Sequence, residues 1–274
     1  MLPSFRRLAA VPLNVDRIVP SSSSTSDRPL IILHGLFGHV QNWRSVGRAL
    51  ASRMHRRVIL ADLRNHGASP RVETMTYEEM AEDVMELART EGGGERVDLL
   101  GHSMGGKTAM VATTTAPSLF ERVIIEDVAP RRYTANTKLF RQFIGGMRTL
   151  DLTRPRQELS KLLESSIADK PVRDFILTNV ATAPDGSLYW RVNVDAAANN
   201  LESILGAKPL PGTFPRPTLF LHGGNSNYLL PSDHDTIRAH FPLAEIEAIP
   251  GAGHWLHAEK PNDFIASIVK FLSK

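Results

Sequence analysis

Short apolar runs recur along the chain, separated by longer segments in which apolar residues return every three or four positions. The runs predict buried strands, because each is too short for a stable helix. They cover residues 30–33, 57–60, 97–100, 123–126 and 218–222. In residues 77–89, by contrast, Met80, Val84, Leu87 and Ala88 fall on one helical face. Strands that alternate with helices predict a doubly wound, mostly parallel α/β sheet.

The alternation stops after Pro130. From residue 131 to about 210 no strand-like run occurs, and the pattern predicts helices over 137–150, 156–166, 171–180 and 194–205. We expect a helical cap, residues 131–210, inserted into a core formed by residues 1–130 and 211–274. Such a lid walls a pocket and excludes water. The alternative is a set of helices that only adds stability.

Composition restricts the class of protein further. The 274 residues, 42% of them hydrophobic, suffice for one large core. The 32 basic and 29 acidic residues form no basic cluster interleaved with aromatics, so we expect no nucleic-acid partner. No apolar stretch reaches the ~18 residues of a transmembrane helix. The absence of cysteine excludes disulfides and a thiolate nucleophile, and fits an intracellular protein.

The N-terminus carries Arg6 and Arg7 and no acidic residue before the first strand, which is expected near Val11. This has some character of a short mitochondrial presequence, but a plain frayed tail is the interpretation that the sequence favours. Residues 21–27 are a serine-rich turn between the first two strands. The expected location is therefore cytoplasmic or mitochondrial, and the oligomeric state stays open.

The motif with the clearest chemistry is Gly-His-Ser-Met-Gly at residues 101–105, between the strand at 97–100 and a helix predicted over 107–115. A Gly-x-Ser-x-Gly turn in this context exposes its serine at a sharp strand-to-helix bend. Ser103 is therefore the candidate nucleophile. The alternative is a glycine-rich turn without chemistry.

Two further segments supply what a nucleophilic serine needs. The strand at 30–33 runs into His-Gly-Leu-Phe-Gly at 34–38, so the backbone N–H groups of Leu36 and Met104 are the predicted oxyanion hole. Near the C-terminus, Gly-Ala-Gly-His-Trp at 251–255 precedes a predicted final helix over 261–272. His254 thus lies on a loop and is the candidate general base.

Taken together, these segments resemble the α/β-hydrolase-fold serine hydrolases, and more narrowly the ABHD11-type and bacterial YbfF-type esterases. The resemblance runs from about residue 11 to the end of the chain. The motifs that point to the narrower group of esterases are Asp-Leu-Arg-Asn-His-Gly-Ala-Ser-Pro at residues 62–70 and Asp-Val-Ala-Pro at residues 127–130. The matching blocks are residues 34–38 with Asn42-Trp43, then 62–70, 101–107, 127–130 and 251–255.

The acid of the triad departs from the common pattern of this superfamily. After the strand at 218–222 the expected aspartate is replaced by Ser226, which cannot carry a negative charge. Asp127 follows the strand at 123–126, beside the nucleophile strand, and is the candidate acid. The resemblance implies the same assignment, with Ser226 as a supporting hydrogen-bond partner. Asp233 and Asp235 are interpreted as helix-capping residues.

The sequence therefore predicts a carboxylic-ester hydrolase that acts on small or medium acyl groups through an acyl-enzyme. Thioester hydrolysis, acyl transfer and C–C hydrolysis remain alternatives with the same triad, as does a non-catalytic binding protein. No cofactor and no metal are expected, because no histidine pair has ligand spacing. The partner is a small-molecule ester or thioester. Candidate substrate-binding residues are Phe37, His102, Phe143, Met147 and Trp255.

Overall fold

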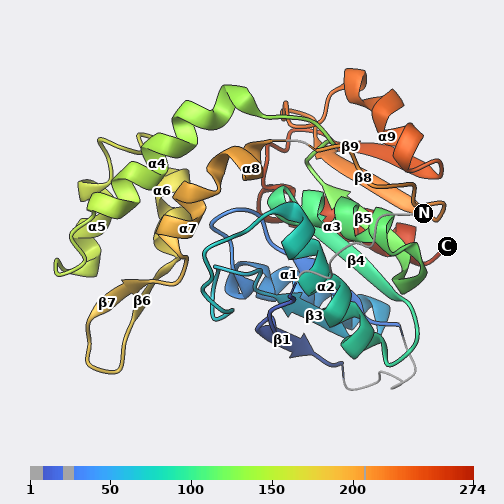
Figure 1. Cartoon of the computed structure of the whole chain (residues 1–274), viewed down its shortest axis with the longest axis horizontal. Helices are drawn as coiled ribbons and strands as arrows, with labels where there is room; N and C mark the ends of the chain where they lie inside the picture. Colours follow the sequence, from blue (N-terminus) through green and yellow to red (C-terminus); the bar gives the residue numbers. More distant parts are fainter. Residues whose placement is uncertain (1–8, 21–27, 207) are drawn as a thin grey trace.

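A computed structural model of the chain describes residues 9–20, 28–206 and 208–274 (Figure 1). At its centre lies a seven-stranded sheet with the order β1-β3-β2-β4-β5-β8-β9. β1 is antiparallel to β3, and all other neighbours are parallel. The strands are β1 (Val15–Ile18), β2 (Leu30–Leu33), β3 (Val58–Ala61), β4 (Val97–His102), β5 (Phe120–Glu126), β8 (Thr218–Gly223) and β9 (Ala244–Ile249). The predicted mostly parallel α/β fold is confirmed.

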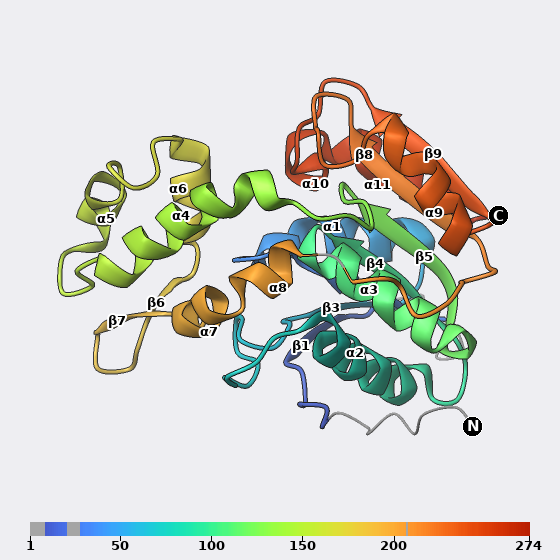
Figure 2. The same ribbon diagram turned by 45° about the horizontal axis from the view of Figure 1, so that its top comes forward.

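Helices cover both faces of this sheet, as a doubly wound topology requires (Figure 2). α1 (Val40–Met54) and α11 (Pro261–Leu272) pack on one face around Trp43 and Phe264. α2 (Tyr77–Gly92) and α3 (Met104–Thr115) pack on the other. The remaining short helices of the core are α9 (His234–His240) and α10 (Leu256–Glu259), with 3₁₀ turns at Pro117–Leu119, Thr134–Asn136 and Pro231–Asp233.

The segment between β5 and β8 is mainly helical and extends away from the sheet (Figure 1). Its helices are α4 (Thr137–Thr149), α5 (Arg156–Leu162), α6 (Lys170–Leu177), α7 (Val194–Asn199) and α8 (Leu201–Leu205). The helix expected over 194–205 is broken at Asn200, whose side chain leaves the helix to accept from Met75 N and donate to Glu73 O. The division of the chain into domains at 130 and 210 stays a prediction.

The expectation that this segment holds no strand is wrong. β6 (Val180–Thr182) and β7 (Leu188–Trp190) form an antiparallel hairpin. Its turn is closed by Asp185, which accepts from the backbone and hydroxyl of Ser187, and by Gly186 at φ +85°. Three-residue strands are too short to give a recognisable alternation, which is why the pattern missed them.

Hydrogen bonds join the end of this mainly helical segment to α2 and to Tyr133 at the segment's own start. The Tyr77 hydroxyl donates to Ile204 O at 2.6 Å, and Tyr133 N donates to Leu205 O at 2.8 Å. At the N-terminus, β1 begins at Val15 rather than near Val11, whose N–H donates instead to Asp83. The predictions on residues 1–8 and 21–27 lie outside the described residues. Within the described ranges, no helix is both long and apolar enough to cross a bilayer.

Candidate active site

Ser103 lies at the bend between β4 and α3. Its backbone has φ 51° and ψ −113°, a conformation that non-glycine residues rarely adopt and that holds the side chain at the tip of the turn. A Cβ at position 101 would lie 2.3 Å from the carbonyl oxygen of Gly105, so the turn requires glycine there. The structure therefore has the strained strand-to-helix bend that the sequence predicts.

A small cavity of about 30 Å³ opens at Ser103. Leu36 and Met104 line it, and within the part of the chain that the structure describes neither backbone N–H donates to a protein acceptor. Both donors are thus free to bind an oxygen atom placed in the cavity. The other lining residues are Tyr77, Lys107, Val128, Tyr133, Phe140, Ile204, Leu205 and Tyr228.

Two buried histidines hold the turn that carries Leu36. Nε2 of His34 accepts from Leu63 N at 3.0 Å, and Nε2 of His66 accepts from Phe37 N at 3.2 Å. Burial lowers the pKa of His34 to about 4 and that of His66 to about 3, so both rings are neutral acceptors near neutral pH. The block at residues 62–70 therefore helps to hold the turn that carries Leu36 and does not line the cavity.

The carboxylate of Asp127 is fully buried and receives three hydrogen bonds. Oδ1 accepts from Gly223 N at 3.0 Å, and Oδ2 accepts from the Ser226 hydroxyl at 2.5 Å. Nδ1 of His254 lies 2.7 Å from Oδ2. Because a carboxylate only accepts, Nδ1 carries the proton and Nε2 has a free lone pair. The structure thus brings together Asp127, Ser226 and His254, at the edge of the sheet where Ser103 lies.

Tyr228 connects His254 to the cavity. Its ring stacks on the His254 ring with centroids 3.9 Å apart, and it lines the cavity beside Ser103. The Tyr133 hydroxyl donates to Tyr228 O at 2.6 Å and so fixes this loop. Sequence reasoning missed both tyrosines, because they lie in irregular segments and follow no motif.

A second buried polar cluster lies behind the His254 loop. Oε1 of Glu126 accepts from the backbone N–H of His257 at 3.1 Å and lies 2.8 Å from its Nδ1, while Nε2 of His102 donates to His254 O at 3.0 Å. Burial raises the pKa of Glu126 to about 7 and lowers those of His102 and His257 to about 3. The cluster holds the loop in place.

The same cluster is the one group of described residues whose donors could hold a metal ion. Ligand atoms of His102, Glu126 and His257 lie within 4.8 Å of one another. The hydrogen bonds to His254 O and between Glu126 and His257 already use donors of this set. The expectation that the protein needs no metal stays a prediction.

The predicted substrate-binding residues do not line the cavity at Ser103. Phe143 and Met147 are buried in the packing of α4, which instead presents Phe140 to the cavity. The Phe37 side chain is also buried. His102 belongs to the cluster behind the loop, and the Trp255 ring packs near Phe175 of the cap, with centroids 5.6 Å apart.

Comparison with known proteins identifies relatives of this chain. The alpha/beta hydrolase fold family matches residues 28–261. The "sn-1-specific diacylglycerol lipase ABHD11" of Danio rerio is 39% identical over 98% of this chain and 85% of its own length. "Esterase YbfF" of Escherichia coli is 32% identical over 95% of this chain and 99% of its own.

A solved structure described as "Marine microorganism esterase" is 36% identical, with a TM-score of 0.88, and the match covers 96% of this chain and 100% of that one. These relationships confirm the resemblance noted from the motifs and the predicted enzyme class, a carboxylic-ester hydrolase. The chain belongs to the α/β hydrolase fold family.

Proposed function

We propose that this chain hydrolyses carboxylic esters of small or medium acyl groups through an acyl-enzyme formed on Ser103. The observation that carries the proposal is the 2.7 Å contact between Nδ1 of His254 and the buried carboxylate of Asp127. That contact sets the tautomer in which Nε2 can act as a base, and it stabilises the imidazolium that forms when Nε2 takes a proton.

In the proposed first step, Nε2 of His254 takes the hydroxyl proton of Ser103 while Oγ attacks the acyl carbonyl carbon. The oxyanion accepts hydrogen bonds from the N–H groups of Leu36 and Met104. The C–O bond to the alcohol then breaks, and the alcohol leaves with the proton from His254. In the second step, water gives a proton to His254 and its oxygen attacks the acyl carbon. The bond from that carbon to Oγ then breaks, Oγ takes the proton back from His254, and the acid leaves.

The relatives support esters over the alternatives. The two curated relatives are named as a diacylglycerol lipase and an esterase. Thioester hydrolysis, C–C hydrolysis and acyl transfer would use the same three residues, so a series of acyl esters and acyl-CoAs assayed on the purified protein separates them.

The direct test is steady-state hydrolysis of a short aryl ester by Ser103→Ala and His254→Ala. Each change should lower kcat by about 10⁴- to 10⁶-fold, and the two losses should not add, because the residues act as one unit. Thermal melting checks that both variants fold. A folded Ser103→Ala protein that kept a tenth of the activity would overturn the proposal.

A further inference from the structure

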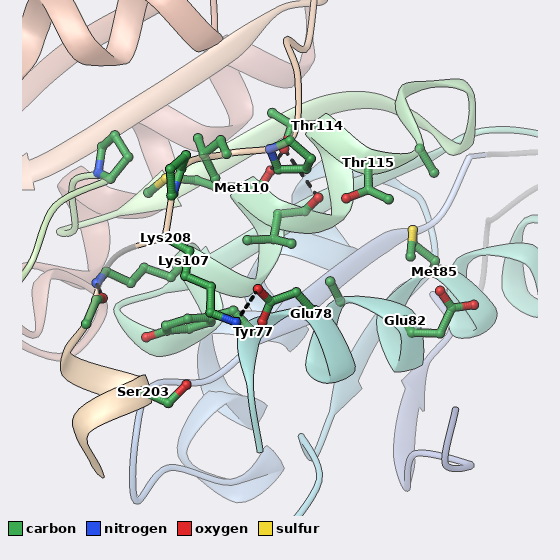
Figure 3. Close-up of a pocket in the computed structure, with 18 of the residues that line it drawn as sticks. Tyr77, Glu78, Glu82, Met85, Lys107, Met110, Thr114, Thr115, Ser203 and Lys208 are labelled. Atoms are coloured by element: carbon green, nitrogen blue, oxygen red, sulfur yellow. Dashed lines mark hydrogen bonds and ion pairs between the residues drawn. The ribbon is translucent and has the colours of Figure 1, made fainter. Parts of the chain in front are cut away.

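A second and much larger cavity, of about 1010 Å³, lies between α2, α3 and the end of the cap, where α8 and the residues after it line the cavity (Figure 3). It is separate from the cavity at Ser103, although Tyr77 and Lys107 line both. Its volume is that of a small-molecule binding site. Much of its wall is apolar and includes Ala81, Met110 and Val111. A cavity of this kind favours a ligand with a hydrocarbon portion.

Lys107 is the unusual polar group of this cavity. Its side chain is buried, and Nζ donates to Gly206 O at 2.6 Å and lies 4.7 Å from the centre of the Tyr133 ring. No carboxylate among the described residues pairs with this ammonium. An ammonium has three N–H donors, so two remain for a ligand. Burial, and secondarily Arg131, lower the pKa of Lys107 to about 7, as expected of a cation without a counter-ion.

The acidic residues around the cavity do not neutralise Lys107, because other cations already pair with them. These pairs lie at the rim and are Glu78–Lys208 at 2.8 Å, Glu82–Arg89 at 3.7 Å and Glu202–Arg141 at 2.6 Å. Figure 3 shows the first pair, and it places Lys107 near one end of the site and Met85 near the other. Lys107 is therefore a buried cation without a carboxylate partner among the described residues, and it lies at one end of an apolar space. Arg132 also lines the cavity but is exposed to solvent.

We propose that this cavity binds an amphipathic carboxylate, a fatty-acid anion, with its carboxylate on the Lys107 ammonium and its chain against Met110, Val111 and Met85. The carboxylate neutralises a cation that is otherwise buried without a counter-ion, and burial of the chain removes apolar surface from water. The site differs from the catalytic cavity and does not depend on hydrolysis by Ser103.

Calorimetric titration with decanoate tests the proposal on the whole chain. Wild-type protein should bind decanoate saturably and more tightly than octanoate, by up to about fourfold for each added methylene. Lys107→Met should weaken decanoate binding roughly 10- to 100-fold and leave binding of decanol, the uncharged analogue, unchanged. Lys161→Met, which removes an exposed lysine of the cap, is the matched control and should bind like wild type.

Val111→Trp fills the cavity, keeps the Lys107 ammonium, and should weaken both decanoate and decanol binding by about tenfold or more. Its control is Leu162→Trp, at an exposed position of α5. Hydrolysis of a short ester by Val111→Trp should stay near wild type, so binding and catalysis are measured separately. A decanoate that carries a photoreactive diazirine should crosslink to α2 or α3.

The proposal is wrong if wild-type protein shows no saturable decanoate binding, or if Lys107→Met and Val111→Trp both bind decanoate like wild type. Crosslinks confined to residues that do not line this cavity would also overturn it. If Lys107→Met fails to fold, Val111→Trp and the crosslinking still decide the question.

Discussion

Oδ2 of Asp127 and Nδ1 of His254 lie 2.7 Å apart, although 127 positions separate the two residues in the chain. The contact joins the end of β5 to the loop before α10, and the Ser226 hydroxyl lies 2.5 Å from the same carboxylate oxygen. The carboxylate therefore follows β5, and a serine stands after β8, where the common pattern of the superfamily places the acid.

Asp127→Asn should lower kcat for a short ester by about 10⁴-fold near neutral pH, because an amide cannot stabilise the imidazolium and can impose the wrong tautomer. Ser226→Ala removes a neutral donor, and its cost of roughly 0.5–1.5 kcal/mol corresponds to about 2- to 13-fold. Steady-state kinetics on both variants measure the difference. If Asp127→Asn stayed near wild type while Asp233→Asn collapsed, the acid would lie after β8 instead.

His66→Leu should disturb the turn that carries Leu36, the proposed oxyanion donor, although His66 does not line the cavity. The change removes the acceptor of Phe37 N, one residue after Leu36, and leaves a buried N–H unpaired. We expect a loss of about 1–3 kcal/mol in the free energy of unfolding, and a fall of roughly 10- to 100-fold in kcat with little change in KM. His240→Leu is the control. It removes a histidine ring that contacts Gly212 O and that, among the described residues, makes no hydrogen bond with the Leu36 turn, so it should leave kcat unchanged. Equal effects of the two changes on kcat would argue against this role of His66.

The structure makes different predictions for two phenylalanines of α4. Phe140 lines the cavity at Ser103, so Phe140→Ala should enlarge it and shift the kcat/KM preference toward longer acyl esters. Phe143 is buried, and Phe143→Ala should cost about 3–5 kcal/mol of stability without changing the preference. An ester chain-length series with urea unfolding measures both. The opposite pattern would return Phe143 to the substrate pocket.

Stability should fall as the pH is lowered from about 6.5 to 4. His34, His66, His102 and His257 have pKa values of about 3 to 4 in the folded protein, so the unfolded chain, with histidine pKa values near 6.5, binds up to four more protons in this range. Glu126 offsets one of these four protons. Its pKa is raised from 4.5 to about 7 in the folded protein, so between these pH values the folded state binds a proton on Glu126 that the unfolded chain does not.

The net uptake of up to three protons corresponds to a slope of at most about 4 kcal/mol per pH unit. Urea unfolding at several pH values measures this slope. His66→Leu should lower the number of protons taken up on unfolding by about one, and the slope should fall in proportion. A free energy of unfolding that stayed level or rose between pH 6.5 and 5 would contradict the neutral state of these histidines.

The sequence predicted those features that depend on local pattern. The apolar runs gave the parallel strands, and the glycines around Ser103 gave the bend, because each has a direct backbone cause. It also placed Asp127 near His254, since neighbouring parallel strands end at one sheet edge. The lining of the two cavities was not predictable in this way. Whether Phe140 or Phe143 faces Ser103 depends on the rotation of α4 against α7 and α8, and the burial of Lys107 depends on where the cap returns to the core.

Covalent labelling by a fluorophosphonate tests directly whether Ser103 is a nucleophile that His254 activates. Peptide mass spectrometry after labelling should place one phosphonyl adduct on Ser103, and the labelling rate should fall by orders of magnitude in His254→Ala. An adduct on another residue, or labelling of wild type and His254→Ala at equal rates, would contradict the account.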